Sequence, residues 1–238
     1  MAFLSYKSFI NLIYPLKCQI CNTALDYNTI DSICLDCRHD IEINLPPFCN
    51  KCGRPLQTGK YSCKNKHQNL SQIDRAWIVC SYQGVIRTLI HRLKYNNKLA
   101  VLNFIANLCC NFAEKFIALS EIDCITYVPL TRQKKMQRDF NQSELIARKI
   151  AKRFKMKILD NVLLKTKPTR PQVEVTGHER LSNLTGSFKV RKDNLVKDKN
   201  ILIIDDVLTT GSTLNECAGC LKQAGACSVF ALALAGGN

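Results

Sequence analysis

The sequence predicts an α/β protein, a doubly wound parallel sheet preceded by a small cysteine-rich module. Three observations support this prediction. Strand-like and helix-like segments alternate from Asp74 onward, residues 201–204 are wholly apolar, and seven cysteines lie between residues 18 and 63. Such alternation is typical of parallel sheets covered by helices. We expect a cysteine-rich module over residues 1–72 and an α/β domain over residues 73–238.

The elements of the α/β domain follow from hydrophobic periodicity and from residues typical of helix ends. Strands are predicted at residues 76–82, 124–130, 201–207 and 228–235. Helices are predicted at residues 85–93, 99–117, 141–154 and 212–224. Asn141 and Glu144 have the spacing of a capping box, Pro129 stops a strand, and Gly225 suits the end of a helix. The polar, basic segment 165–187 is predicted to be a mobile loop.

The composition is that of a globular chain. Hydrophobic residues make up 46% of its 238 residues, and no run approaches the ~18 apolar residues that a membrane span needs. The apolar segment 1–18 lacks the basic start and the small-residue cleavage site of a secretory signal. We expect a short helix there that packs on its own domain, with a membrane-surface role as the alternative. We also expect a cytoplasmic location.

The chain is strongly basic, with 34 Lys and Arg against 19 Asp and Glu and a formal net charge of +15. The densest stretch, residues 132–157, has ten basic residues against two acidic ones. Such a surface suits phosphates, of a small ligand or of a nucleic acid, although a merely solubilising surface is the alternative. The predicted helix after Asn141 gathers four of these residues on one face: Arg148, Lys149, Lys152 and Arg153.

The cysteines of the first module indicate a metal rather than disulfides, because no secretory signal precedes them. Two Cys-x-x-Cys pairs, separated by 12 residues, are formed by Cys18, Cys21, Cys34 and Cys37. Each pair can place two thiolates ~2.3 Å from one ion, and two pairs complete a tetrahedron. Four thiolates leave no position for a catalytic water, so a structural Zn²⁺ is predicted.

A second set of possible ligands follows, although its spacing is less regular. It consists of Cys49, Cys52, Cys63 and His67. These residues either hold a second zinc or represent a ribbon that has lost a ligand. The other cysteines lie in apolar patterns and are expected in the core: Cys80, Cys109, Cys110, Cys124, Cys217, Cys220 and Cys227.

The segment ILIIDDVLTTGSTL, residues 201–214, combines acceptors and donors at the end of a predicted strand. Ligands of open α/β sheets bind at the carboxyl ends of strands. Two adjacent carboxylates can accept from sugar hydroxyls, and the hydroxyl-rich turn at a helix N-terminus can donate to a phosphate. A ribose 5-phosphate ligand is therefore predicted. A strand–helix turn that uses Asp only as a cap is the alternative.

This segment resembles the 5-phosphoribosyl-1-diphosphate (PRPP) signature of type I phosphoribosyltransferases. The paired cysteines, YQGVIRTLIHRLKY (82–95), RQKKMQRDFNQSELIAR (132–148) and TRPQ (169–172) together resemble the ComF family of competence proteins, also called the GntX family. Two departures stand out: Asp139 occupies a usual Gly position, and the second cysteine set ends in His67. The resemblance implies a type I phosphoribosyltransferase-like sheet behind a zinc ribbon.

The resemblance also implies roles for individual residues. Asp205 and Asp206 would hold the ribose hydroxyls. The 5′-phosphate would lie in a cradle made by Thr209, Thr210, Gly211, Ser212 and Thr213. The pyrophosphate loop would be Val128, Pro129 and Leu130. Cations for the pyrophosphate, acting with Mg²⁺, would be Arg132, Arg138, Arg170 and Arg180.

Two functions are compatible with these residues. The first is a competence protein that binds PRPP and handles single-stranded DNA in the cytoplasm, with other competence proteins as partners. The second is an active phosphoribosyltransferase of nucleobase salvage, a glycosyltransferase. Because no segment that would recognise an acceptor base is identifiable in the sequence, the first is favoured.

Overall fold

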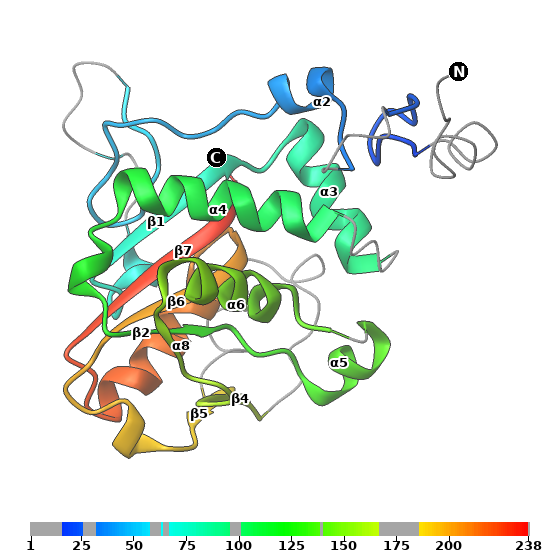
Figure 1. The fold of residues 1–238 in the computed structure, drawn as a ribbon. Helices are drawn as coiled ribbons and strands as arrows, with labels where there is room; N and C mark the ends of the chain where they lie inside the picture. The colour runs from blue at the N-terminus through cyan, green and yellow to red at the C-terminus, as the bar shows by residue number, and fades with distance from the viewer. Residues whose placement is uncertain are drawn as a thin grey trace.

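The computed structural model describes residues 16–25, 32–57, 63, 67–95, 101–138, 140–166 and 186–237. Its centre is a five-stranded parallel sheet in the order β1-β7-β6-β2-β3 (Figure 1). The strands are β1 (Arg75–Ser81), β2 (Cys124–Tyr127), β3 (Lys157–Ile158), β6 (Asn200–Leu208) and β7 (Ser228–Gly236). The parallel α/β class is thereby confirmed.

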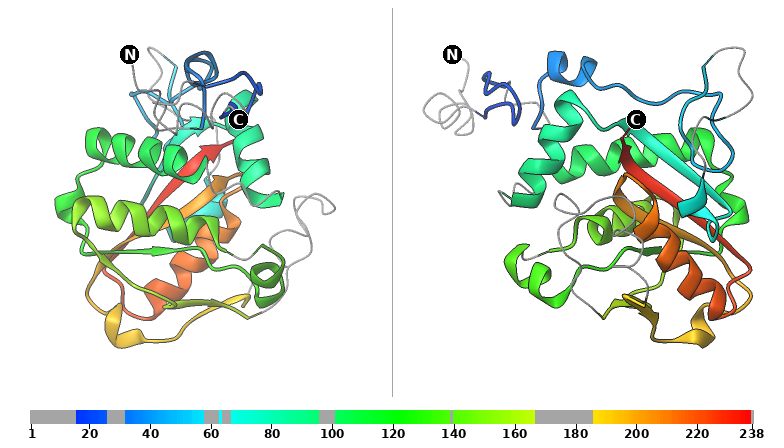
Figure 2. Two further views of the ribbon diagram at one scale, coloured as in Figure 1. Left: turned by 45° about the vertical axis from the view of Figure 1, so that its right-hand side comes forward. Right: turned by 180° about the vertical axis from the view of Figure 1, so that it is seen from behind.

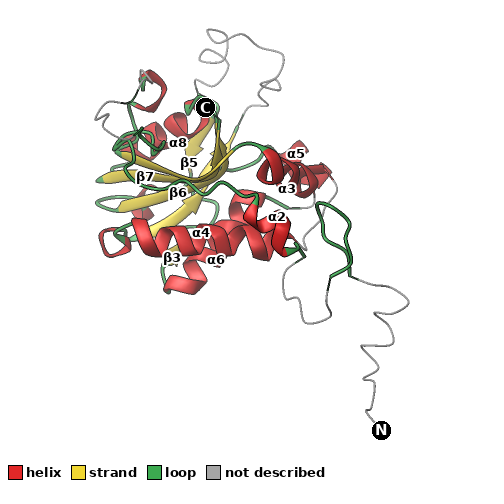
Figure 3. Ribbon diagram, turned by 90° about the horizontal axis from the view of Figure 1, so that it is seen from above, coloured by secondary structure: helices red, strands yellow, loops and turns green. Residues whose placement is uncertain are grey.

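Helices cover both faces of the sheet. On one face lie α4 (Leu102–Phe116) and α6 (Gln142–Phe154), and on the other lies α8 (Ser212–Gln223), as Figures 2 and 3 show. Further helices are α2 (Leu35–His39), α3 (Gly84–Tyr95) and α5 (Arg132–Arg138). Short 3-10 turns are η1 (Gln68–Leu70), η3 (Leu119–Glu121) and η4 (Asp193–Leu195), and β4 (Leu163–Lys165) pairs with β5 (Phe188–Val190).

Alternate residues of the central strand explain this layering. In β6, Leu202 and Ile204 pack with the core on the α4 and α6 side, whereas Ile201 and Ile203 pack with the core on the α8 side. Successive side chains of a strand point to opposite faces, so a strand covered on both faces must be apolar throughout. The apolar run that precedes the two aspartates is therefore explained by its central position.

Several predicted element ends are confirmed, with small differences. α6 begins after Asn141, whose Oδ1 accepts from the Ser143 N–H at 3.1 Å. Glu144 does not complete a reciprocal capping box, because its Oε1 accepts from Arg148 at 3.0 Å instead. α8 is followed by Gly225 at a φ of +92°, the left-handed conformation that favours glycine. β2 ends at Tyr127, two residues before Pro129.

The cysteine-rich segment packs on the sheet rather than standing apart. Asn44 N–H donates to the Val79 carbonyl at 2.9 Å, and Ile43 forms an antiparallel bridge with Cys80 of β1. The Phe48 ring lies 5.4 Å from the ring of Phe116 on α4. A division of the chain at residue 72 stays a prediction.

The predicted core cysteines are buried with two exceptions: Cys220 is half-buried, and Cys227 is exposed. The expectation for Cys227 was wrong because this residue precedes β7 (Ser228–Gly236) and lies outside the apolar strand. The predicted N-terminal helix, Asp139 itself and most of the predicted loop 165–187 fall outside the described residues. No helix in the described ranges is long and apolar enough to cross a membrane.

Candidate functional site

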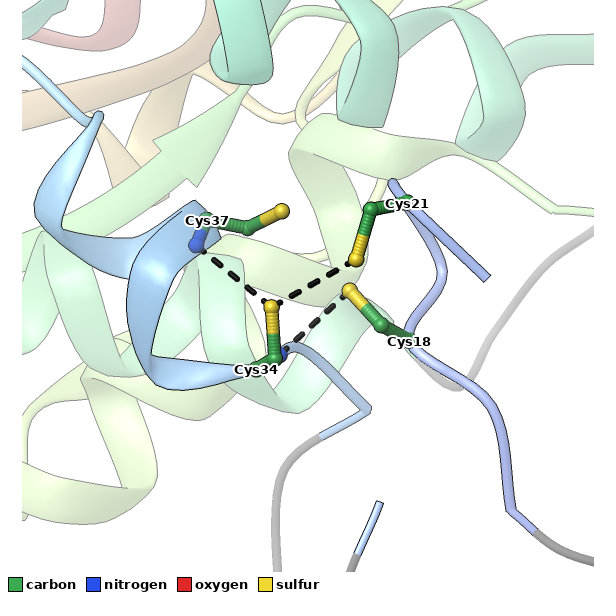
Figure 4. Close-up of side chains that lie close together, drawn as sticks. All are labelled: Cys18, Cys21, Cys34 and Cys37. Carbon is green, nitrogen blue, oxygen red and sulfur yellow. Dashed lines mark hydrogen bonds between the residues drawn. The ribbon is translucent and has the colours of Figure 1, made fainter. Parts of the chain in front are cut away.

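The first cysteine cluster brings four sulfur atoms together at the N-terminus of α2, where Cys34 is the N-cap and Cys37 lies in the helix (Figure 4). Its members are Cys18, Cys21, Cys34 and Cys37, and their Sγ atoms lie within 4.8 Å of one another. The Sγ atoms of Cys21 and Cys34 are 3.6 Å apart. Four sulfurs ~2.3 Å from a tetrahedral ion are about 3.8 Å from one another, so the cluster fits Zn²⁺.

Local hydrogen bonds prepare these sulfurs for metal binding. The backbone N–H groups of Ile20 and Cys34 each lie 3.4 Å from the Cys18 Sγ atom, to which they donate. Hydrogen bonding to the Thr23 hydroxyl, 3.2 Å from the Cys21 Sγ atom, together with the Thr23 backbone and the neighbouring Cys18 and Cys34, lowers the pKa of the Cys21 thiol to about 6. Because the thiolate is the form that binds zinc, these bonds favour the metal-bound state.

The second cluster is also assembled, despite its irregular spacing. The ligand atoms of Cys49, Cys52, Cys63 and His67 lie within 4.8 Å of one another. The Sγ atoms of Cys52 and Cys63 are 3.6 Å apart, and the Cys49 Sγ atom is 3.4 Å from Nε2 of His67. This geometry favours a second zinc site over a ribbon that has lost a ligand.

The two aspartates lie at the carboxyl end of β6 and have different partners. Oδ1 of Asp205 accepts from the Ser143 hydroxyl at 3.1 Å and from the Asp206 N–H at 2.8 Å. Oδ2 of Asp206 forms an ion pair with Nζ of Lys94 at 2.7 Å. Burial and, secondarily, the negative charge of Asp206 raise the pKa of Asp205 to about 7. Asp205 therefore exchanges its proton near neutral pH rather than in the acidic range of an ordinary aspartate.

The predicted phosphate cradle, residues 209–213, comes directly after the end of β6. Gly211 has a φ of +86° and is the N-cap of α8. The hydroxyls of Thr210 and Ser212 lie 3.1 Å apart, and the loop lines a small open pocket of about 30 Å³ together with Asp205. Thr209 and Thr213 also line this space. The N-terminus of α8 and the hydroxyls can donate to an anion there.

The predicted pyrophosphate loop lies beside the carboxylates. Val128 N–H donates to the Ile204 carbonyl at 3.0 Å, and Asn141 Nδ2 donates to the Val128 carbonyl at 2.9 Å. Pro129 and Leu130 follow, half-buried. Arg132 and Arg138 belong to α5 (Arg132–Arg138). Arg170 and Arg180 fall outside the described residues, so their roles stay predictions.

Three residues of the site were missed by the sequence reasoning: Lys94, Asn141 and Ser143. Each lies in one of the segments that resemble the ComF family, but Asn141 was considered only as a helix cap. Lys94 is at the end of α3 and reaches the acidic pair from a distant part of the chain. The resemblance of residues 82–95 to the ComF family was the feature of the sequence that could have indicated a role for Lys94.

The predicted basic face of α6 is exposed but partly neutralised. The Arg148 guanidinium pairs with Glu144 at 3.0 Å and with Asp160 at 2.7 Å. Arg153 pairs with Glu114 at 2.8 Å. Lys149 and Lys152 are exposed. The α6 face therefore offers less positive charge than its four basic residues imply.

Comparison with known proteins gives matches to both parts of the chain. Residues 9–65 match the model of a double zinc ribbon domain, and residues 141–238 match that of a phosphoribosyl transferase domain. Competence protein F of Haemophilus influenzae is 27% identical over 216 residues, 89% of this chain and 93% of that protein. The chain is therefore homologous to competence protein F along nearly its whole length.

Two further relatives have the same full-length coverage. DNA utilization protein YhgH of Escherichia coli K12 is 27% identical over 223 residues, 92% of this chain and 96% of that protein. Competence protein ComFC of Bacillus subtilis is 24% identical over 237 residues, 90% of this chain and 91% of that protein. The zinc-ribbon match and the two clusters together support structural zinc. His67 lies beyond the matched range 9–65, so its membership of the second cluster rests on geometry.

Proposed function

We propose that this ComF-type chain acts in the cytoplasm in the uptake or use of DNA, and that its α/β domain binds a PRPP-type ligand with Mg²⁺. The names of the full-length relatives support the DNA role. The observation that carries the ligand is the arrangement at the end of β6, where the acidic pair adjoins the hydroxyl loop and the N-terminus of α8. Asp205, an acceptor for a sugar hydroxyl, and the donors for a phosphate thus line one pocket, and Asp206 is next to Asp205 in the chain.

Each part of this pocket has a distinct task in the proposal. Asp206, whose charge is balanced by Lys94, accepts from ribose hydroxyls, while Ser143 fixes the orientation of Asp205. Thr210, Ser212 and the backbone of Gly211 donate to the 5′-phosphate. Mg²⁺ bound with PRPP would neutralise charge on the diphosphate. Arg132, Arg138, Arg170 and Arg180 are proposed to add cations to that end of the ligand.

For single-stranded DNA, the proposal relies on the exposed lysines of α6. Lys149 and Lys152 have exposed side chains, whereas Arg148 and Arg153 already pair with carboxylates. Strand binding that depends on phosphate contacts weakens with salt. Replacing both lysines by Ala should make the slope of log K against log salt shallower by about 1.4, because each phosphate contact contributes about 0.7.

The test is a fluorescence-anisotropy titration of an oligonucleotide at several salt concentrations. The matched control replaces Lys197 and Lys199, which are also exposed but precede the central strand β6 rather than lying on α6. The control should keep the wild-type slope. An unchanged slope in the Lys149 and Lys152 variant would remove α6 from the DNA interface. Other competence proteins are proposed to bind this chain, and their effect on DNA binding can be measured by the same titration.

An active phosphoribosyltransferase is the second candidate, favoured by the acidic pair in a phosphoribosyl transferase domain. Cleavage at C1 of the ribose develops negative charge on the departing pyrophosphate, which cations must stabilise. Pyrophosphate release from PRPP would be measured with a panel of purine and pyrimidine bases. Turnover that is lost in the Asp205→Asn and Asp206→Asn double variant would support this candidate, and no turnover with any base would exclude nucleobase salvage.

A further inference from the structure

The second cysteine–histidine cluster contacts the phosphate loop through a residue close to one of its ligands. Arg54 follows Cys52 by two positions, and its Nη2 donates to the carbonyls of Thr209 at 3.1 Å and Gly237 at 2.9 Å. Nε of Arg54 donates to the Gly237 carbonyl at 3.0 Å. The Arg54 carbonyl accepts from the N–H of Cys49, another member of the cluster, at 2.8 Å. Arg54 therefore connects a metal ligand with the first residue of the loop.

A second connection starts from another ligand of the same cluster. His67 is followed directly by η1 (Gln68–Leu70), and Leu70 is 3% exposed. A Cβ atom at Gly211 would lie 2.4 Å from Cδ2 of Leu70 and 3.1 Å from the Asn69 carbonyl oxygen. Nearby, the Gln72 N–H donates to Oδ1 of Asn215 on α8 at 2.8 Å. The centre of the loop and the start of α8 thus lie against the chain that leaves His67.

The segments that contain Arg54 and η1 are not packed continuously against the loop 209–213. A pocket of about 200 Å³ opens between them, lined by Arg54, His67, Gln68, Asn69, Leu70, Thr209 and Thr210. The hydrogen bonds of Arg54 and the close approach of Leu70 to Gly211 are therefore contacts through which a displacement near the metal ligands can change the position of the loop. A single substitution at either point should have a measurable effect.

We propose that metal binding at Cys49, Cys52, Cys63 and His67 holds the loop 209–213 in its ligand-binding form, with Arg54 and Leu70 as positioning residues. A segment of this size depends on its metal to fold. Without the metal, Arg54 and η1 lose their fixed positions, and the loop must be ordered at the moment of binding. The apparent ligand affinity is then the intrinsic affinity multiplied by the fraction of molecules whose loop is already ordered. This inference rests on the proposed function for the identity of the ligand.

The test compares two substitutions at one ligand position in the full-length, zinc-loaded protein. His67→Ala removes a ligand, whereas His67→Cys keeps four ligands and should retain the second zinc. Metal content is measured first. Hydrogen–deuterium exchange of the peptide that spans residues 207–214 is then followed without any ligand. We expect about tenfold faster exchange in His67→Ala and wild-type exchange in His67→Cys.

Arg54 is tested with its metal in place. Arg54→Ala should keep both zinc ions yet show faster exchange of residues 207–214 and about tenfold weaker PRPP binding with Mg²⁺. The matched control is Arg191→Ala, an exposed arginine after β5. Cys21→Ala tests the first cluster, whose segment contacts α3 through a hydrogen bond from Arg92 to the Gln19 carbonyl. Neither control should change exchange of the loop.

The outcomes separate this inference from the proposed function. Unchanged exchange in His67→Ala, with loss of one zinc confirmed, would overturn the inference whatever the protein binds. Unchanged exchange in folded Arg54→Ala would overturn the role of Arg54. If the variants differ from the wild type in loop exchange as expected, but the wild-type protein does not bind PRPP, the metal positions the loop and the proposed ligand is wrong. If Arg54→Ala does not fold, Leu70→Ala replaces it in both measurements.

Discussion

Replacement of Asp205 by Asn should stabilise the protein at alkaline pH. The folded-state pKa of Asp205 is about 7, above the ordinary value of 3.8. Between these two values the folded state keeps a proton that the unfolded state has released, so stability falls as pH rises. Above pH 7 the full cost is present, about 4 kcal/mol at 1.36 kcal/mol per pH unit. Asn mimics the protonated form and can still accept from Ser143 and from the Asp206 N–H.

The assay is urea denaturation of the zinc-loaded wild type and Asp205→Asn at pH 5 and pH 8. The stability gained by the variant should be about 2.5 kcal/mol larger at pH 8 than at pH 5. Asp206→Asn is the matched control, since it removes a carboxylate that already has a partner in Lys94 and should give no comparable gain. A gain in Asp205→Asn that does not change with pH, or a loss, would refute the reasoning.

Three further predictions follow from the site and the metal clusters. PRPP affinity should be about tenfold lower at pH 6 than at pH 8, because Asp205 is largely protonated at the lower pH; calorimetry should show a smaller pH dependence in Asp205→Asn, and equal dependence would contradict this. Gly211→Ala should cost about 1–3 kcal/mol and abolish binding, because its φ is +86° and its Cβ would meet Leu70; Gly237→Ala, whose Cβ meets nothing within 4 Å, should change denaturation midpoints little. Removal of zinc by a chelator should lower the melting temperature measured by circular dichroism, with recovery on zinc addition, since the clusters supply folding energy; an unchanged melt after confirmed metal loss would contradict this.

Local patterns were sufficient to predict the sheet and the first cluster. The apolar run of β6 and the hydroxyls after Asp206 lie close together in sequence, and so do the two Cys-x-x-Cys pairs. The structure confirms the class of fold and brings all four cysteines of the first cluster together. In each case one segment of chain contains the whole signal.

Long-range contacts could not be predicted in the same way. Lys94 reaches Asp206 from the end of α3, and Ser143 reaches Asp205 from the start of α6. Neither contact has a spacing that periodicity can detect, because both depend on how the helices pack on the sheet. The same limit applies to Arg148 and Arg153, whose carboxylate partners Asp160 and Glu114 lie on other elements or turns.

Calorimetric titration with PRPP and Mg²⁺ tests the central claim most directly. We predict saturable binding at one site to wild-type protein, and loss of that binding in the Asp205→Asn and Asp206→Asn double variant, with circular dichroism showing that the variant is folded. Absence of binding to wild type, or equal binding to the folded double variant, would contradict the assignment of the β6 loop as a phosphoribosyl site.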